Sequence, residues 1–217
     1  MASMTLDFLS QQLHLADQLL AGRNAMLEPQ DLPGRYGRVI HSIDNVLETM
    51  NCPAVLAGGW AVWRHGYVGR VTQDVDVVLP ARQVDEFLRV AAVGGFEVVA
   101  VAPGIWPKVR HKDTGIQVDI LPEGQRPGTA SRPAPTTIPH PQNLGAVPGK
   151  LRYISLAALV ELKLAAGRAR DESDIVELLR ANPQDVEAIR GHVAGVHADY
   201  AASLAVLIER AREQDEK

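Results

Sequence analysis

The chain has 217 residues, of which 46% are hydrophobic and 22% charged, with a formal net charge of −4. These proportions are typical of globular domains and exclude a fully disordered chain, and the sequence holds no apolar run of about 18 residues that would predict a membrane span. The acidic balance excludes the broad basic surface of a dedicated nucleic-acid binder, and the single cysteine, Cys52, excludes an internal disulfide. Because the first residues also lack the basic start and apolar core of a secretory signal, we expect a cytoplasmic protein with no membrane partner.

The first 50 residues have a helical pattern. Leucines between Leu6 and Leu20 recur with a period close to 3.6 residues, and residues 34–50 place a second set of apolar side chains on one face. We therefore predict an N-terminal helical segment over residues 1–50.

Residues 51–122 alternate between strand and helix patterns. Short apolar runs bounded by glycine, proline or turn residues predict strands, and longer runs with helical spacing predict helices. The predicted strands are 53–57, 73–79, 96–101, 105–111 and 116–121, and the predicted helices are 59–67 and 82–93. The last two strands are joined by a predicted hairpin turn at 112–115. This range predicts a small mixed sheet and the core of an α/β (α+β) fold.

A proline-rich connection follows over residues 123–149. Seven of the fourteen prolines lie between Pro122 and Pro148, and no long apolar period continues through this stretch. The composition is compatible with two interpretations, a long irregular loop that serves the site and a disordered linker between two lobes.

Residues 150–217 predict a C-terminal helical lobe. Ser155 is a suitable N-cap for a helix over 156–167, and Asp171 is predicted to cap a helix over 172–180. Two further amphipathic runs, 184–197 and 199–213, complete the lobe.

Two aspartates on a predicted strand carry the first chemical signal. In the stretch Arg70 to Val78, alternation along a strand directs Asp74 and Asp76 to one face with Thr72 beside them. Neighbouring carboxylates repel each other and raise each other's pKa unless a cation lies between them. A hard divalent metal with oxygen ligands, Mg²⁺ or Mn²⁺, is the natural cation for such a pair.

A third aspartate and a glycine pair extend this site. Asp119 alternates with apolar residues on the strand 116–121, so pairing of that strand beside 73–79 would bring Asp119 to the other two acids. Three carboxylates can hold one or two metal ions for phosphoryl transfer. Gly58 and Gly59 follow a strand at the start of a predicted helix, where backbone N–H groups can approach a phosphate.

These motifs together resemble the nucleotidyltransferase fold of the DNA polymerase β type. The pattern is strand, Gly-Gly, helix, then Arg-x-Thr-x-Asp-x-Asp and a later lone aspartate, over residues 54–122. Within that superfamily the chain is similar to small bacterial proteins related to AbiEii-like toxins and to antibiotic adenylyltransferases. The stretch from Leu159 to Ile175, with Lys163, Asp171 and Asp174, also resembles a helical element of the AbiEii-like group.

The resemblance implies transfer of a nucleoside monophosphate from an NTP, such as ATP, to an acceptor hydroxyl or phosphate, with loss of pyrophosphate. It implies metal binding by Asp74, Asp76 and Asp119, with Asp119 also accepting the proton of the attacking hydroxyl. It further implies that the Gly58-Gly59 backbone and Lys163 contact the triphosphate. Arg70 and Thr72 flank the acids and are expected to contact phosphate or to order the strand. Relatives commonly carry a serine directly after the first glycine, a position that Gly59 fills in this sequence.

The acceptor is left open between an RNA, most plausibly a tRNA end as in toxin relatives that pair with an antitoxin, and a small hydroxylated molecule such as an aminoglycoside antibiotic. A non-catalytic nucleotide-binding or protein-interaction module on the same fold is the alternative function. The seven histidines show no zinc-like spacing with each other or with Cys52 and are expected to be structural or solvent-facing, and Cys52 is not expected to be a catalytic thiol.

Overall fold

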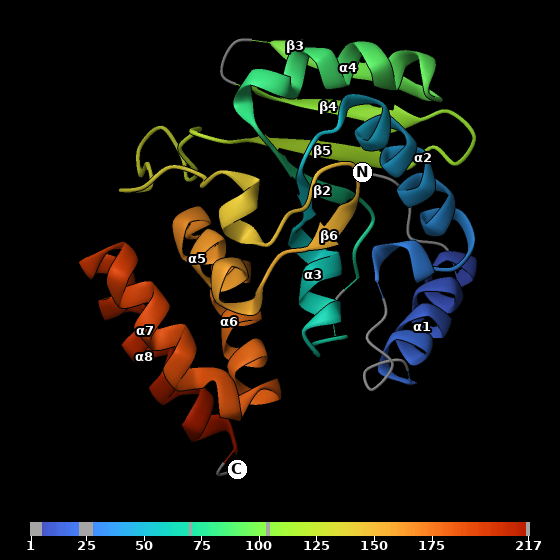
Figure 1. Cartoon of the computed structure of the whole chain (residues 1–217). Coiled ribbons are helices and arrows are strands. Elements are labelled where there is room, and N and C mark those ends of the chain that lie inside the picture. Colours follow the sequence, from blue (N-terminus) through green and yellow to red (C-terminus); the bar gives the residue numbers. More distant parts are fainter. Residues whose placement is uncertain (1–5, 22–27, 70, 103–104, 216–217) are drawn as a thin grey trace.

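The computed structural model describes residues 6–21, 28–69, 71–102 and 105–215, and a six-stranded mixed sheet forms its centre (Figure 1). The strands lie in the order β3-β4-β5-β2-β1-β6, with parallel pairing of β2 with β5 and of β1 with β6 and antiparallel pairing elsewhere. Their bounds are β1 Ala54–Leu56, β2 Val75–Leu79, β3 Phe96–Ala102, β4 Ile105–His111, β5 Gln117–Pro122 and β6 Leu151–Tyr153.

Helices flank the sheet and make up the chain from Leu156 onwards, as far as it is described. The α-helices are α1 Leu6–Ala21, α2 Gly34–Met50, α3 Gly58–Arg64, α4 Val84–Val93, α5 Leu156–Ala166, α6 Ala169–Ala181, α7 Val186–Val196 and α8 Ala198–Asp215. Short 3-10 helices are η2 Pro29–Asp31, η3 Ala81–Gln83, η4 Pro141–Leu144 and η5 Pro183–Asp185. The α/β fold class predicted from the sequence is confirmed.

Alternation along the central strands separates the two faces of the sheet. On β2, Val75 and Val77 are buried against α2 and α4, and on β5, Val118 and Ile120 join the same core. The intervening residues of both strands face the opposite side, where α3, α5 and η4 lie. Because the period of a strand is two residues, one set of apolar side chains builds the core and leaves the other set free to line a site.

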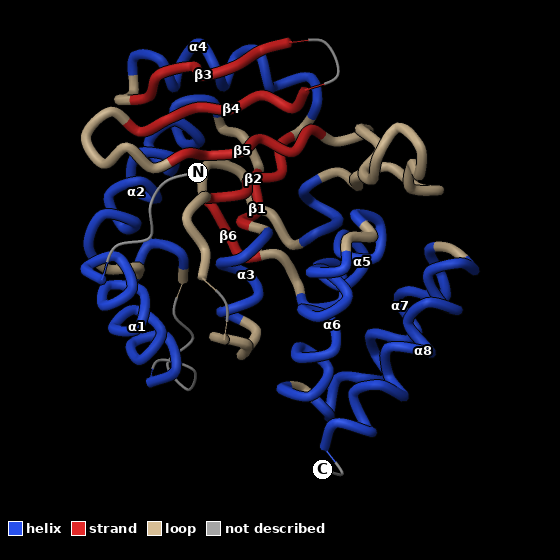
Figure 2. Tube along the Cα trace, turned by 180° about the vertical axis from the view of Figure 1, so that it is seen from behind, coloured by secondary structure: helices blue, strands red, loops and turns tan. Residues whose placement is uncertain are grey.

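The C-terminal helices form a second hydrophobic cluster. Apolar side chains of α5, α6, α7 and α8 pack together, and Figure 2 shows these helices beside the sheet, with α7 and α8 farthest from it. Helices α5 and α6 contribute to both this cluster and the cluster on the sheet, so they join the lobe to the sheet. Ser155 caps α5 as predicted, its Oγ accepting a hydrogen bond from the Ala158 backbone N–H at 3.4 Å.

Two features differ from the sequence-based expectation. The predicted N-cap role of Asp171 is wrong, because α6 begins at Ala169 and Asp171 is a buried residue in its first turn. The strand β6 was not predicted, and it comes from the range expected to be a helical lobe. Its three residues are too few to show an alternating pattern.

Within the described ranges, none of the helices combines the length and the apolar character needed to cross a membrane.

Candidate active site

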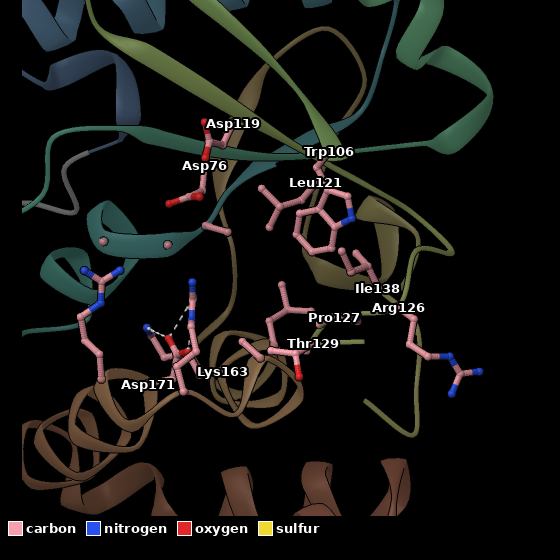
Figure 3. Close-up of a pocket in the computed structure, with 18 of the residues that line it drawn as sticks. Asp76, Trp106, Asp119, Leu121, Arg126, Pro127, Thr129, Ile138, Lys163 and Asp171 are labelled. Atoms are coloured by element: carbon pink, nitrogen blue, oxygen red, sulfur yellow. Dashed lines mark hydrogen bonds and ion pairs between the residues drawn. The ribbon is translucent and has the colours of Figure 1, made fainter. Parts of the chain in front are cut away.

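The aspartates singled out in the sequence meet at one pocket. In the parallel pair β2–β5, Asp76 and Asp119 are register partners, so their side chains lie beside each other on the face opposite the α2–α4 core (Figure 3). Asp74, one residue before β2, lines the same pocket. The pocket has a volume of about 740 Å³ and lies between the sheet, α5 and the proline-rich segment.

The Gly58-Gly59 turn is fitted against the Asp76 carboxylate. Gly58 has a φ of +60°, and a Cβ at this position would lie 1.7 Å from the Asp76 Oδ2. The Ala57 N–H donates a hydrogen bond of 2.8 Å to the Asp76 backbone carbonyl. Only glycine satisfies both the left-handed backbone and the close approach, so the turn brings bare backbone to the acids.

The carboxylate of Asp76 has an unusual electrostatic environment. Burial is the main cause that raises its pKa to about 7, and the negative charges of Asp74 and Asp119 add to this effect. The positive charges of Lys163 and Arg168 act in the opposite direction. A carboxylate that holds a proton near neutral pH because it is buried beside two other acids indicates a position where a cation would relieve repulsion.

Asp119 is held by two side chains that the sequence analysis did not single out. Lys108 of β4 donates to the Asp119 Oδ2 at 2.7 Å, and the Gln117 Nε2 donates to the Oδ1 at 2.6 Å. Among the residues that the structure describes, no three His, Cys, Asp or Glu side chains are grouped closely enough to hold a metal ion as they stand. Lys108 is therefore the cation that Asp119 contacts in this arrangement.

Lys163 projects from α5 into a buried ionic network. Its ammonium lies 3.3 Å from the Asp171 Oδ1 and 2.5 Å from the Asp174 Oδ2, and Arg168 donates to the Asp171 Oδ2 at 2.6 Å. Burial alone would raise the pKa of Asp171, but the hydrogen bond from Arg168 and the charges of Lys163 and Arg168 leave it below its ordinary value. The network fixes Lys163 at the pocket wall that faces Asp76 (Figure 3).

The remaining predicted phosphate contacts are placed differently. Arg70 lies outside the described residues. Thr72 is buried and does not line the pocket. Its backbone N–H donates to the Gln12 Oε1, and its carbonyl accepts from the Tyr36 hydroxyl. The strand begins only at Val75, so the alternation that predicted a shared face for Thr72 and the acids does not extend back to it.

Two further parts of the pocket were missed in the sequence, namely Trp106 with Lys108 on β4 and the segment from Arg126 to Pro133. The hairpin linking β4 and β5 was predicted, and alternation along β4 puts Trp106 and Lys108 on one face. The register Lys108–Asp119 would have identified that face as the one carrying the third acid. The proline-rich segment carried no such signal, because its composition does not specify hydrogen-bond partners.

In their chemistry, though not in their present spacing, the three aspartates fit a divalent metal ion. Asp74, Asp76 and Asp119 line one pocket, the pKa of Asp76 is raised by burial and by the two other acids, and its Oδ2 fits against Gly58 because no Cβ is present there. The mixed sheet places Asp76 and Asp119 in register on neighbouring strands beside the Gly-Gly turn, which is the arrangement that the resemblance to the nucleotidyltransferase fold implies.

One known family matches part of the chain. Residues 39–126 match the family model described as aminoglycoside-2''-adenylyltransferase. The matched stretch begins in α2, ends just after β5, and includes the Gly58-Gly59 turn and the three aspartates. The match supports the predicted resemblance to antibiotic adenylyltransferases. No curated protein sequence matches the chain.

Solved structures with similarity to the chain include two of ANT(2'')-Ia. One, a crystal structure in complex with adenylyl-2''-tobramycin, is 17% identical, with 82% of this chain and 97% of that chain covered and a TM-score of 0.44. The other, a solution structure of the same antibiotic-resistance factor, is 18% identical, with 82% and 92% covered and a TM-score of 0.40. The crystal structure of JHP933 from Helicobacter pylori is 10% identical, with 84% and 96% covered and a TM-score of 0.36.

Proposed function

We propose that the chain is a metal-dependent nucleotidyltransferase that moves a nucleoside monophosphate from an NTP to a hydroxyl of a small molecule. The observation that carries the proposal is the register of Asp76 with Asp119 on parallel strands, with Asp74 and the Gly58-Gly59 turn beside them. The family match over these same residues supports it.

Each part of the pocket has a role in such a transfer. Asp74, Asp76 and Asp119 would hold the divalent ions, which when bound would stabilise the charge on the transferring phosphoryl group. The backbone of Gly58 and Gly59 would contact the β- and γ-phosphates, because both residues line the pocket and neither carries a side chain. Lys163 offers positive charge to the same phosphates from the opposite wall.

Asp119 is the carboxylate proposed to accept the proton of the attacking hydroxyl. Its two oxygens are oriented by Lys108 and Gln117, which fix the carboxylate in one position at the pocket floor. A base must lie within hydrogen-bond distance of the proton that it takes, so this orientation favours an acceptor that enters beside Asp119.

An aminoglycoside-type hydroxyl is the acceptor that the family description favours. A tRNA end and an antitoxin partner, the toxin-like alternative, receive no support from the family match. Cytosolic RNA therefore enters the test as a competing acceptor rather than as part of the proposal.

The test is a transfer assay with α-labelled NTPs, MgCl₂ or EDTA, and either tobramycin or total RNA. We expect label on the small molecule in the presence of metal only, and a loss of about 100-fold or more in rate for Asp76→Asn. Asp85→Asn, an exposed change in the first turn of α4, is the matched control and should leave the rate unchanged.

Other outcomes would redirect the proposal. Label on RNA that Asp76→Asn abolishes would assign the toxin-like acceptor. A chain that is stabilised by Mg²⁺ and an NTP analogue but transfers label to neither acceptor would support the non-catalytic nucleotide-binding module instead.

A further inference from the structure

The sheet order determines which part of the pocket lies on which side of the carboxylates. Across the sheet, the Gly58-Gly59 turn at the end of β1 comes first, then the β2 acids, then Asp119 on β5, and finally β4. In phosphoryl transfer the attacking and leaving oxygens are roughly in line. If the proposed function holds and pyrophosphate leaves at the Gly58 side, the acceptor hydroxyl approaches from the β5–β4 side.

That side of the pocket has an apolar wall. Trp106 precedes Lys108 by two residues on β4, and Leu121 follows Asp119 by two residues on the antiparallel β5, so both lie on the pocket face next to the Lys108–Asp119 pair. Figure 3 shows Trp106 and Leu121 beside each other, with Ile138 and Pro127 completing the wall. Trp106 is only partly buried, so part of its indole is available for contact.

Residues 125–138, here called the Pro-rich hairpin, close this wall with regular hydrogen bonds. The Ile138 N–H donates to the Gln125 carbonyl and the Ala134 N–H to the Pro127 carbonyl, both at 2.9 Å. The Arg126 guanidinium donates across the hairpin to the Ala134 carbonyl at 2.8 Å and to the Pro135 carbonyl at 3.2 Å. The composition of this segment left open a loop that serves the site and a disordered linker. The structure shows a folded segment that lies against the pocket.

The tip of the Pro-rich hairpin reaches the pocket, and its base is fastened to the helical lobe. Gly128, Thr129 and Ala130 line the pocket at the tip. At the base, the Thr136 hydroxyl and the Tyr200 hydroxyl of α8 are 2.9 Å apart, and Ala134 is buried in the core of the helical lobe. The hairpin thus presents Pro127 and Thr129 from a supported scaffold.

Under the proposed function, the carboxylates of the pocket already have partners, so we do not expect ion pairing to be the main attraction for a ligand at this wall. Of the described residues that line the pocket, four are acidic. Asp171 is occupied by Lys163 and Arg168, and the other three are the proposed metal ligands. No further carboxylate remains on the described β4 and hairpin walls to pair with ammonium groups of an acceptor.

We infer that Trp106, Pro127 and Thr129 form the acceptor subsite and that it binds a hydroxylated saturated ring by its C–H face. The ring would stack on the Trp106 indole, with Thr129 as the polar contact and Asp119 beside the reacting hydroxyl. Recognition then depends on ring shape and apolar contact and is independent of the number of ammonium groups. This inference rests on the proposed function for the direction of approach.

The test compares Trp106→Ala with Trp106→Phe in the full chain. We expect Trp106→Ala to raise the acceptor KM by about tenfold or more, and Trp106→Phe to restore most of the affinity, because phenylalanine keeps an aromatic face for the ring. The NTP KM and the thermal shift produced by an NTP analogue with Mg²⁺ should stay unchanged in both variants, which also shows that the site is folded.

Salt dependence separates this subsite from an ion-pairing one. The acceptor KM for tobramycin, rich in amino groups, and for spectinomycin, with fewer, should change less than about twofold between low and roughly 0.5 M salt, because screening acts on charge pairs and not on stacking. A steep increase in KM with salt, or an unchanged acceptor KM in Trp106→Ala, would overturn the inference.

Calorimetric binding distinguishes failure of the inference from failure of the proposed function. If the wild-type chain transfers label to no acceptor, the proposed function fails. Binding of tobramycin and spectinomycin, each in the presence of an NTP analogue and Mg²⁺, then decides the subsite. Weaker binding of these acceptors to Trp106→Ala than to the wild type supports the subsite. No binding to the wild type, or equal affinity in the two chains, contradicts the subsite.

Discussion

At the scale of single residues, the contact between Gly58 and Asp76 ties backbone geometry to chemistry. We expect Gly58→Ala to lower activity by about 100-fold, since a displacement of about 1 Å in a catalytic group has an effect of that size. It should also destabilise the fold by about 1 kcal/mol or more, because the residue has a positive φ. The measurement is kcat/KM together with urea unfolding.

Gly115→Ala is the matched control for this change. Gly115 has a φ of +70°, but a Cβ there would meet nothing within 4 Å. This variant should show the backbone cost alone, with normal activity. Equal loss of activity in the two variants would show that the Asp76 carboxylate is not what Gly58 accommodates.

The raised pKa of Asp76 predicts how stability depends on pH. The folded chain holds this proton up to about pH 7, whereas an unfolded chain releases it near the ordinary value of 3.8. The contribution to stability is therefore complete at low pH and is lost as pH rises through about 7. The metal-free wild type should lose more in Tm between about pH 5 and pH 8 than Asp76→Asn does.

Addition of MgCl₂ provides the companion measurement. The ion should raise the Tm of the wild type at about pH 8 and have a smaller effect on Asp76→Asn, because binding to the native state alone stabilises it. Parallel pH profiles for the two chains would contradict the assigned environment of Asp76.

At the scale of elements, the Lys163 network fixes α5 to the first turn of α6. Asp171→Asn removes the charge that faces both Lys163 and Arg168, and we expect a loss of about 3 kcal/mol in the free energy of unfolding, since this carboxylate is buried. Glu172→Gln, which breaks an exposed pair with Arg210, should cost less than about 1 kcal/mol. Urea titration of both variants measures the difference.

The strands also show why the acidic part of the site could be predicted from the sequence. Alternation on β2 and β5 separates the core valines from Asp76 and Asp119, and that pattern is visible without a structure. The role expected for Asp171 as a cap was wrong, because an acid near the start of a helix fits both a cap and a buried ion pair. Only the position of Lys163 in space distinguishes the two.

At the scale of the whole molecule, the Pro-rich hairpin connects the sheet to the helical lobe. Tyr200→Phe removes one hydroxyl of the contact between Thr136 and α8, and we expect a loss of about 1 kcal/mol in stability. Thr136→Val combined with Tyr200→Phe should cost little more than either change alone, because both remove the same hydrogen bond. Additive losses in this double-mutant cycle would show that the two hydroxyls do not act as a pair.

Long-range arrangement explains what the sequence alone did not predict. The parallel pairing of β1 with β6 joins residues nearly a hundred positions apart, and Lys108 meets Asp119 only through the register of β4 and β5. Composition and periodicity describe neighbours along the chain, so they predicted the helices and the acid-bearing strands but not these partners. The predicted division at residues 122 and 150 remains a proposal.

The position of β6 has a practical consequence for shortened versions of the protein. A polypeptide ending near residue 126 would include the family-matched stretch but would lack β6, the strand that pairs with the outer edge of β1. The amide groups of Ala54, Val55 and Leu56 would then be exposed along an apolar border, which favours self-association between truncated molecules.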